Sequence, residues 1–302
     1  MSGTEVKEDL NCSGNCSSCS DSGCEALAQK PGESMEDYLK RQKLILRMKS
    51  IKHKIVVLSG KGGVGKSTIA VNLAISLSLA GKKVGLLDVD IHGPSVPTML
   101  NMVNIGVKTD GENLLPVEIG GLKVMSVGFL LENRDSAVIW RGPMKMGVIE
   151  QLLRDVNWGE LDYLLIDSPP GTGDEPLSVV QLVGDMDGAI MVTTPQDVAA
   201  ADVRKSLDFC RQLNLRVLGI VENMSGFICP HCGTETEIFK GDNGRKMAEK
   251  AGVPFLGKIP IDPAVGLSSD SGKPFVYNYG KTETSKRFEK LAEPLLDLLE
   301  EQ

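Results

Sequence analysis

The 302-residue chain has few aromatic residues, no long basic run and no long apolar run. A general nucleic-acid binder needs a basic face, and the formal net charge of −7 argues against that class. The longest apolar run, residues 69–80, is interrupted by Asn72, Ser76 and Ser78 and is too short to cross a bilayer. The first residues are acidic and lack the apolar core of a secretory signal. We therefore expect a cytoplasmic protein with no nucleic-acid partner and no membrane partner.

The apolar residues that are present follow two alternating patterns from residue 54 onward. Short β-type runs such as residues 54–60, 83–90 and 163–170 alternate with stretches of helical periodicity, such as residues 66–80 and 199–213. This alternation is typical of a parallel sheet that helices cover on both faces. We therefore predict an α/β fold with a doubly wound, mainly parallel sheet.

Composition divides the chain into three predicted segments. Residues 1–32 are rich in Ser, Gly, Asp and Cys and form a cysteine-rich N-terminal extension with almost nothing to build a core. Residues 33–52 form a linker helix, in which Ser34 and Asp37 resemble a capping box. The remaining residues, 53–302, form the main domain.

Residues 285–302 predict a closing helix with one apolar face, formed by Phe288, Leu291, Leu295 and Leu298. Pro294 is expected to kink or divide this helix because proline lacks a backbone N–H and clashes with the preceding turn. The helix could pack on the domain or lie on a membrane surface. Interfacial helices usually carry Lys and Arg on their polar face, whereas this one ends in acidic residues, so we expect it to pack on the domain.

The clearest motif is SGKGGVGKST, which follows a β-type run and opens a helical stretch. It fits the phosphate-binding pattern G-x-x-x-x-G-K-S/T, whose backbone N–H groups and helix N-terminus converge on phosphate oxygens. In such a loop the lysine holds the β- and γ-phosphates of ATP and the serine ligates Mg²⁺. The alternative is a glycine-rich turn without a ligand. The predicted ATP-binding residues are Gly60, Lys61, Gly62, Gly63, Val64, Gly65, Lys66, Ser67 and Thr68.

Acidic residues end two of the predicted strands. Asp167 follows four apolar residues, which brings it to the carboxyl edge of the sheet, where open α/β folds bind ligands. There it can hold Mg²⁺ or a water ligand of the metal. Asp90 is the candidate for positioning the attacking water. Asp88 lies on the same face of the strand and is expected to contact residues of the site rather than the nucleotide itself. Alternatively, Asp88 and Asp90 only cap the segment that follows.

An ordinary P-loop does not require a lysine directly after its first glycine, yet Lys61 stands at this position in GKGGVGKS. This sequence resembles the deviant Walker A ATPases, which include the MinD and ParA proteins and the nitrogenase iron protein. In that group the extra lysine reaches across a dimer interface to the nucleotide of the partner. The resemblance therefore implies a nucleotide-sandwich homodimer, and it places Lys61 with Lys66, Asp90 and Asp167 in the catalytic set.

Four further motifs narrow the resemblance. They are DVDIHGPSVP at 88–97, WRGPM at 140–144, DSPPGTGDEP at 167–176 and ENMSGFICPHC at 222–232. From about residue 50 to its end, the chain resembles the Mrp/ApbC family of iron–sulfur cluster carrier ATPases, which includes the eukaryotic cytosolic scaffold proteins. The resemblance implies that residues 92–95 and 168–175 are switch segments that sense the γ-phosphate. It also implies that Asn223 and residues around Pro260 bind adenine.

His92 lies inside the first of these switch segments. Nothing in the sequence pairs it with an acid, so we interpret it as a loop residue rather than a catalytic one.

Cys229 and Cys232 supply two thiols, which is half of what a zinc ion or an iron–sulfur cluster usually takes. No second C-x-x-C follows nearby, and His231 lies between the two thiols at a spacing unsuited to a third ligand. Cys210 shares a helix face with Val203 and Leu207, which indicates a small core residue. In a two-fold dimer, two such pairs make the four thiolates of a bridging [4Fe–4S] cluster, and the resemblance implies the same. Zinc and a bare redox pair remain as alternatives.

Four further cysteines lie close together near the N-terminus and supply enough thiols for a second cluster within one chain. The resemblance to the family is weaker here, because its N-terminal motif places the first cysteine farther from the central pair. We favour an N-terminal [4Fe–4S] cluster, with zinc or free thiols as alternatives. The four residues are Cys12, Cys16, Cys19 and Cys24.

Together these features predict a homodimeric, slow ATPase that binds [4Fe–4S] clusters and transfers them to apoproteins. One rival is a spatial organiser of the MinD or ParA type, which shares the P-loop and Lys61 but has no use for the CPHC sequence. Another is a nucleotide-driven electron donor like the nitrogenase iron protein. The two cysteines of that protein lie on separate segments, whereas Cys229 and Cys232 lie in one loop.

Overall fold

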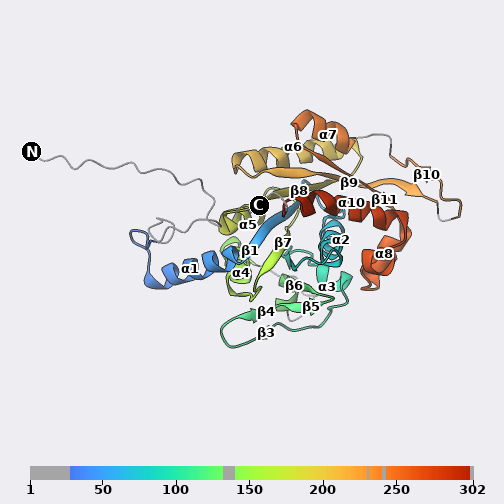
Figure 1. Cartoon of the computed structure of the whole chain (residues 1–302). Coiled ribbons are helices and arrows are strands. Elements are labelled where there is room, and N and C mark those ends of the chain that lie inside the picture. The colour runs from blue at the N-terminus through green and yellow to red at the C-terminus, as the bar shows by residue number, and fades with distance from the viewer. Residues whose placement is uncertain (1–27, 132–139, 230, 240–242, 300–302) are drawn as a thin grey trace, which may run out of the picture.

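The computed structural model describes residues 28–131, 140–229, 231–239 and 243–299 (Figure 1). In this part of the chain a nine-stranded sheet has the order β10-β9-β8-β1-β7-β2-β6-β5, and β11 pairs with β9. All pairs are parallel except β5 with β6 and β10 with β9. The predicted α/β fold with a mainly parallel sheet is confirmed.

Strands occur at each of the predicted β-type runs, together with several very short ones. A separate two-stranded sheet is made by β3 and β4. The strands are β1 (Ile51–Ser59), β2 (Val84–Asp88), β3 (Lys108–Thr109), β4 (Leu114–Leu115), β5 (Val117–Ile119), β6 (Leu122–Ser126), β7 (Leu161–Asp167), β8 (Gly188–Thr193), β9 (Val217–Ile228), β10 (Glu235–Thr236) and β11 (Phe255–Ile261).

The helices follow the strands in the manner of a doubly wound fold. They are α1 (Met35–Lys49), α2 (Lys66–Leu79), α3 (Val96–Met99), α4 (Gly142–Asp155), α5 (Asp174–Val183), α6 (Asp197–Gln212), α7 (Asn243–Ala251), α8 (Pro263–Asp270), α9 (Phe275–Asn278) and α10 (Glu283–Asp297), with a 3-10 turn at Val127–Leu130.

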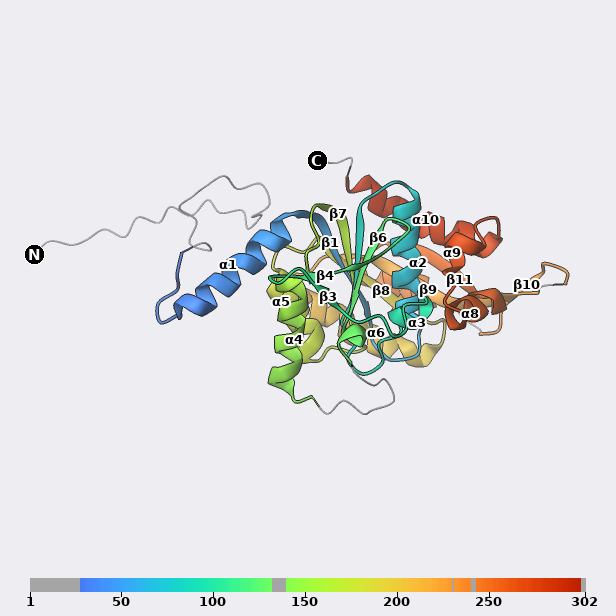
Figure 2. The same ribbon diagram turned by 90° about the horizontal axis from the view of Figure 1, so that it is seen from below.

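The central strands read as continuous apolar runs because both faces of the sheet are covered. Figure 2 shows α4 and α5 on one side of the sheet and α2 and α10 on the other. Strands β8, β1, β7 and β2 are neighbours, and Asp88 stands in register with Asp167. Their parallel direction brings the loops after all four strands to one edge, and the candidate site lies there.

Helix α10 packs on the domain as expected, with Phe288, Leu291 and Leu295 fully buried. The Tyr163 hydroxyl of β7 donates to the Leu295 carbonyl at 2.6 Å. Pro294 does not divide the helix, which runs without a break to Asp297. A proline removes only one backbone donor, and burial of the apolar face on both sides of it holds the helix together.

Helix α1 begins where the sequence predicts. The Ser34 hydroxyl accepts from the Asp37 backbone N–H at 3.1 Å, as in a capping box. Leu44 and Met48 are buried, while the start of the helix projects from the domain (Figure 1). The division of the chain into 1–32, 33–52 and 53–302 stays a prediction.

Cys210 lies on the buried face of α6 and is fully buried, in agreement with its interpretation as a core residue. Burial raises the pKa of its thiol to about 11, so it stays protonated and unreactive near neutral pH. Across the described ranges, we find no helix with the length and apolar character that a membrane span requires.

Candidate functional site

The loop between β1 and α2 forms one wall of an open cavity of about 250 Å³ at the carboxyl edge of the sheet. Gly63 and Gly65 have φ of 76° and 81°, in the left-handed region that favours glycine. The cavity is lined by Ser59, Lys61, Gly62, Gly63, Val64, Gly65, Lys66, Ser67, Thr68, Asp90, Gly93, Ser95, Met99 and Pro170. Most of the predicted phosphate-binding residues therefore face one space, at the N-terminus of α2.

Lys66 lies under this loop among the acidic residues that end β2 and β7. Its Nζ is 2.5 Å from Asp167 Oδ1 and 3.9 Å from Asp90 Oδ2. Lys66 and Asp167 are buried, so their charges compensate each other in a site with little water. When a phosphate enters the loop, Lys66 can exchange this carboxylate for phosphate oxygens without losing a charged partner.

Asp88 is buried behind this pair. It accepts from the Asp90 backbone N–H at 3.0 Å and from the Ser126 hydroxyl at 2.8 Å. Burial, together with the neighbouring Asp167, raises the pKa of Asp88 to about 8. Burial also raises the pKa of Asp167, while the Lys66 ammonium acts in the opposite direction. The site thus holds two buried carboxyl groups that compete for one nearby cation.

One atom of this cluster fits a divalent cation. Asp167 Oδ2 is buried and has no hydrogen-bond partner among the described residues, although an ionised carboxylate oxygen ordinarily has one. Ser67, the residue after Lys66, lines the neighbouring cavity. Carboxylate and hydroxyl oxygens are the ligands that Mg²⁺ prefers, so the residues present fit this metal.

Asp90 holds the first turn of the loop that follows β2. Its Oδ1 accepts from the Gly93 backbone N–H at 3.3 Å. Its position in the cavity wall agrees with the predicted task of orienting a water, which stays a prediction.

The two residues predicted at the adenine lie on neighbouring strands, since Asn223 of β9 stands in register with Ile259 of β11, next to Pro260. The Asn223 side chain, however, is turned toward the P-loop. Its Nδ2 donates to the Val64 carbonyl at 2.8 Å, and a Cβ on Gly65 would clash with the same nitrogen. Their role toward adenine stays a prediction.

Lys61 lines the cavity, and its Nζ is 3.4 Å from Gln196 Oε1 in the loop after β8. This single weak contact, at the open side of the loop, leaves its ammonium free of an acidic partner among the described residues. The reach of Lys61 across a dimer interface stays a prediction.

His92 lies in the loop after β2, as interpreted from the sequence, and it has an acidic neighbour that the sequence did not indicate. Its Nε2 is 3.6 Å from Glu175 Oε1 and 2.8 Å from Lys145 Nζ. Lys145 also donates to Glu175 Oε1 at 2.8 Å. Sequence reasoning missed this cluster because His92 and Lys145 are separated by 53 residues and no local pattern links them.

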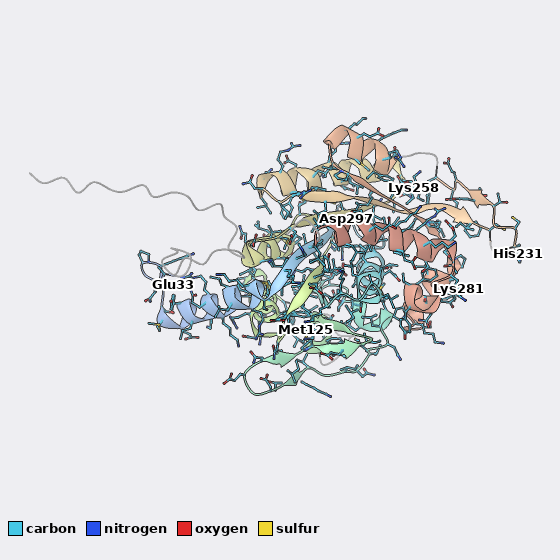
Figure 3. The ribbon with its side chains drawn as sticks, in the orientation of Figure 1. Glu33, Met125, His231, Lys258, Lys281 and Asp297 are labelled. Atoms are coloured by element: carbon cyan, nitrogen blue, oxygen red, sulfur yellow. The ribbon has the colours of Figure 1, made fainter. Side chains whose placement is uncertain are left out.

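Cys229 and Cys232 lie on the turn between β9 and β10, which projects from the domain (Figure 1). His231, between them, is labelled at the outer end of this hairpin in Figure 3. The Gly233 backbone N–H donates to the Cys229 carbonyl at 2.8 Å, and the Cys229 N–H donates to the Thr234 carbonyl at 3.0 Å. On this tight turn Cys232 is exposed and Cys229 is partly buried.

The Cys232 thiol has a lowered pKa. The main cause is the Thr234 hydroxyl, whose oxygen is 3.3 Å from Sγ, followed by backbone bonding at Thr234 and the nearby Cys229 thiol. Thiolates are the form that binds iron or zinc, so the turn favours metal ligation.

Arg287 of α10 fixes the base of the same hairpin. Its guanidinium donates to both carboxylate oxygens of Glu235, at 3.1 and 2.8 Å. This bidentate geometry is the strongest form of an Arg–carboxylate pair. The sequence does not show which distant segments lie close together, so the ion pair between Arg287 and Glu235 was not predicted either.

Two further predictions concern the metal sites. Cys12, Cys16, Cys19 and Cys24 lie outside the described residues. In the ranges that are described, no three His, Cys, Asp or Glu side chains gather in a metal-binding group.

Comparison with known proteins gives a consistent result. A family model described as NUBPL iron-transfer P-loop NTPase matches residues 50–296. An iron-sulfur cluster carrier protein of Methanocaldococcus jannaschii is 47% identical, over 96% of this chain and 98% of that protein. The cytosolic Fe-S cluster assembly factor NUBP2 of Gallus gallus is 49% identical, over 82% of this chain and 93% of that protein.

Solved structures agree on the fold. A nucleotide-binding protein of Archaeoglobus fulgidus, solved with ADP and containing cobalt, is 43% identical. It superposes with a TM-score of 0.70 and covers 78% of this chain and 93% of its own. The septum site-determining protein MinD of Pyrococcus horikoshii, solved with Mg-ADP, has a TM-score of 0.62 at 23% identity, over 82% of this chain and 97% of its own.

Proposed function

The chain belongs to the family of NUBPL iron-transfer P-loop NTPases, and on that premise we propose that it is an ATP-dependent scaffold and carrier of iron–sulfur clusters. It binds [4Fe–4S] clusters and transfers them to apoproteins. The observation that carries this proposal is the path of β9. This one strand contacts the phosphate loop at Asn223 and ends directly before Cys229. In this proposal the nucleotide site and the cluster-binding cysteines are therefore both connected to β9.

ATP enters the cavity with its phosphates on the backbone of the P-loop and on Lys66. Ser67 and Asp167 would hold Mg²⁺, which supplies charge neutralisation at the β- and γ-phosphates. Asp90 orients the attacking water, and Asp88 holds the backbone of Asp90 through the 3.0 Å hydrogen bond. Hydrolysis needs only positioning and charge stabilisation, and a site built on loops that must rearrange is expected to be slow.

The phosphate loop and the thiols are coupled through β9. Because the Asn223 amide holds the Val64 carbonyl, a shift of the P-loop on phosphate binding acts directly on this strand. Met224 and Gly226, with φ of 59° and 84°, lie between this contact and the thiols. Gly226 can adopt more than one backbone conformation at little cost, whereas Met224 is held in a conformation that is strained for a residue with a Cβ. A rearrangement at these two residues would change the angle of the hairpin.

The cargo cluster bridges two copies of the chain. Each copy contributes Cys229 and Cys232 as thiolates from the turn of the projecting hairpin, on either side of His231, which lies at its outer end. Two pairs make the four ligands of a [4Fe–4S] cluster. In the same homodimer, Lys61 extends to the nucleotide of the partner. A cluster held by two thiolates per chain is loosened by small movements of either hairpin, as delivery requires.

Cys12, Cys16, Cys19 and Cys24 hold a second [4Fe–4S] cluster in this proposal. The relative named as a cytosolic assembly factor supports a cytoplasmic location. The clients are apo iron–sulfur proteins, and the net charge of −7 disfavours nucleic acid as a partner.

The proposal is tested by anaerobic transfer of a reconstituted cluster to an apo-enzyme that needs a [4Fe–4S] cluster for activity. Wild-type protein is expected to activate the apo-enzyme and to lose iron in proportion. The variant Cys229→Ala with Cys232→Ala is expected to activate it much less. If the protein keeps its iron while it reduces the acceptor, it is an electron donor and the carrier function is wrong.

A further inference from the structure

Three segments that are distant in the sequence meet at Lys145. It lies in the first turns of α4, and its Nζ donates to His92 Nε2 and to Glu175 Oε1, both at 2.8 Å. His92 belongs to the loop after β2, and Glu175 belongs to the first turn of α5. Lys145 is thus the point at which α4 ties two different loops of the site together.

The same two loops carry the acidic residues nearest to Lys66. The loop after β2 contains Asp90, whose carboxylate oxygens lie 3.9 Å from Lys66 Nζ and 3.3 Å from the Gly93 N–H. His92 is the second residue after Asp90. The loop after β7 begins at Asp167 and continues into α5 at Asp174. Lys145 therefore connects the segment that holds Asp90 to the segment that follows Asp167.

The contact of Lys145 with Glu175 lies within the fold, whereas the His92 side chain is 62% exposed. Lys145 and Glu175 are only 16% and 15% exposed, so water screens their attraction less than at the surface. The N-terminus of α5 stabilises the Glu175 carboxylate further. Burial would raise the pKa of Glu175, but the Lys145 ammonium outweighs it and the pKa is lowered. The Lys145 ammonium can donate hydrogen bonds but cannot accept them. The His92 Nε2 that it contacts is therefore the acceptor and carries no proton.

We propose that Lys145 is a positioning residue that makes the two loops respond to the γ-phosphate as one unit, and thereby sets the preference for ATP over ADP. This inference rests on the proposed ATPase function. The loop after β2 is held by its own turn at Asp90, whereas the loop after β7 is bonded to β1, where the Gly171 N–H donates to the Ser59 carbonyl at 2.8 Å. With Lys145 in place, displacement of one loop is transmitted to the other through the shared ammonium. Lys145 itself touches neither the nucleotide nor the thiols.

The test measures binding of ADP and of a non-hydrolysable ATP analogue by calorimetry. It compares the full-length wild type with Lys145→Met and Lys145→Arg. Lys145→Met is expected to weaken binding of the ATP analogue roughly 10-fold and to change ADP binding less than about 2-fold, as for typical couplings between sites. Lys145→Arg keeps the charge and two donors and is expected to recover part of the loss.

A matched control is Lys43→Met, because Lys43 Nζ pairs with Asp155 Oδ1 at 3.0 Å at the other end of the same helix. It removes an ion pair to α4 without touching the site and is expected to leave both affinities unchanged. Equal weakening of both nucleotides by Lys145→Met, or no weakening of the ATP analogue, overturns the inference while the proposed function stands. A wild-type protein that binds neither nucleotide overturns the proposed function itself.

Discussion

Replacing Lys66 by Met tests the electrostatics of the site most sharply. Lys66 is the cation that lies 2.5 Å from Asp167 Oδ1 and 3.9 Å from Asp90 Oδ2, and Asp88 is buried beside Asp167 in register. Methionine keeps much of the length and apolar stem of the lysine but removes its charge. The change therefore leaves a buried carboxylate without its partner while it disturbs packing little.

The magnitude follows from burial. Removing one partner of a buried ion pair costs about 3–5 kcal/mol of unfolding free energy when the other partner stays charged. Asp167 is fully buried, and Lys66 is the group that opposes the rise of its pKa. Without Lys66, the pKa of Asp167 rises further, so the folded variant binds a proton that the unfolded chain releases.

The sign of the pH dependence is fixed by that raised pKa. Stability from a carboxyl whose folded pKa is raised is present at low pH and is lost as the pH rises through the folded pKa. The deficit of Lys66→Met relative to wild type is thus expected to be larger at the higher of two pH values two units apart, such as about pH 6 and about pH 8. One proton is worth about 1.4 kcal/mol per pH unit, so this difference is at most about 3 kcal/mol.

The assay is urea unfolding followed by the fluorescence of Trp158, which is fully buried. The double variant Lys66→Met with Asp167→Asn removes the orphaned charge and is expected to recover most of the loss. Lys83→Met serves as the control, because Lys83 is 67% exposed and lies 3.8 Å from Glu160 in a surface pair worth at most about 1 kcal/mol. A deficit that is the same at both pH values, or a double variant as unstable as the single one, refutes the reasoning.

The remaining predictions concern the P-loop, the thiols and the hairpin. Gly65→Ala combines a φ of 81° with a Cβ that clashes with Asn223 Nδ2, so nucleotide binding measured by calorimetry is expected to fall at least about 10-fold. Binding equal to wild type contradicts this. In metal-free protein, alkylation near neutral pH is expected to modify Cys232 much faster than the buried Cys210, as mass spectrometry can record. Arg287→Gln removes the bidentate ion pair that ties α10 to Glu235 at the base of the hairpin. Because the hairpin is then held less firmly, cluster transfer is expected to become about 2- to 10-fold faster while the ATPase rate stays unchanged. Slower transfer would argue against a loosened hairpin.

The sequence was sufficient for the parts of the fold that are encoded locally. The apolar runs around Leu86 and Leu165 predicted central strands, and the spacing of Cys210 with Val203 predicted its burial. Strands of two or three residues, such as β3, β4 and β10, have too little length to show a period and were not predicted. Pro294 was expected to kink or divide α10, and the helix is not divided, because tertiary burial outweighs the loss of one hydrogen bond.

The site shows the same division. The P-loop pattern and the strand-end acids were found by motif, and they line or adjoin one cavity. The contacts of Lys145 with His92 and Glu175, and the pair between Arg287 and Glu235, depend on how distant segments pack. No local pattern marks these contacts, so they become visible only once strand order is known.

The central claim is that the cargo cluster is held between two chains by Cys229 and Cys232. The most direct measurement is native mass spectrometry after anaerobic reconstitution, in full-length protein whose Cys12, Cys16, Cys19 and Cys24 are replaced by serine. We predict one [4Fe–4S] cluster per two chains, and loss of both the cluster and the cluster-bound dimer when Cys229 and Cys232 are changed to alanine. One cluster on a single chain, or unchanged cluster content in the alanine variant, would contradict the account.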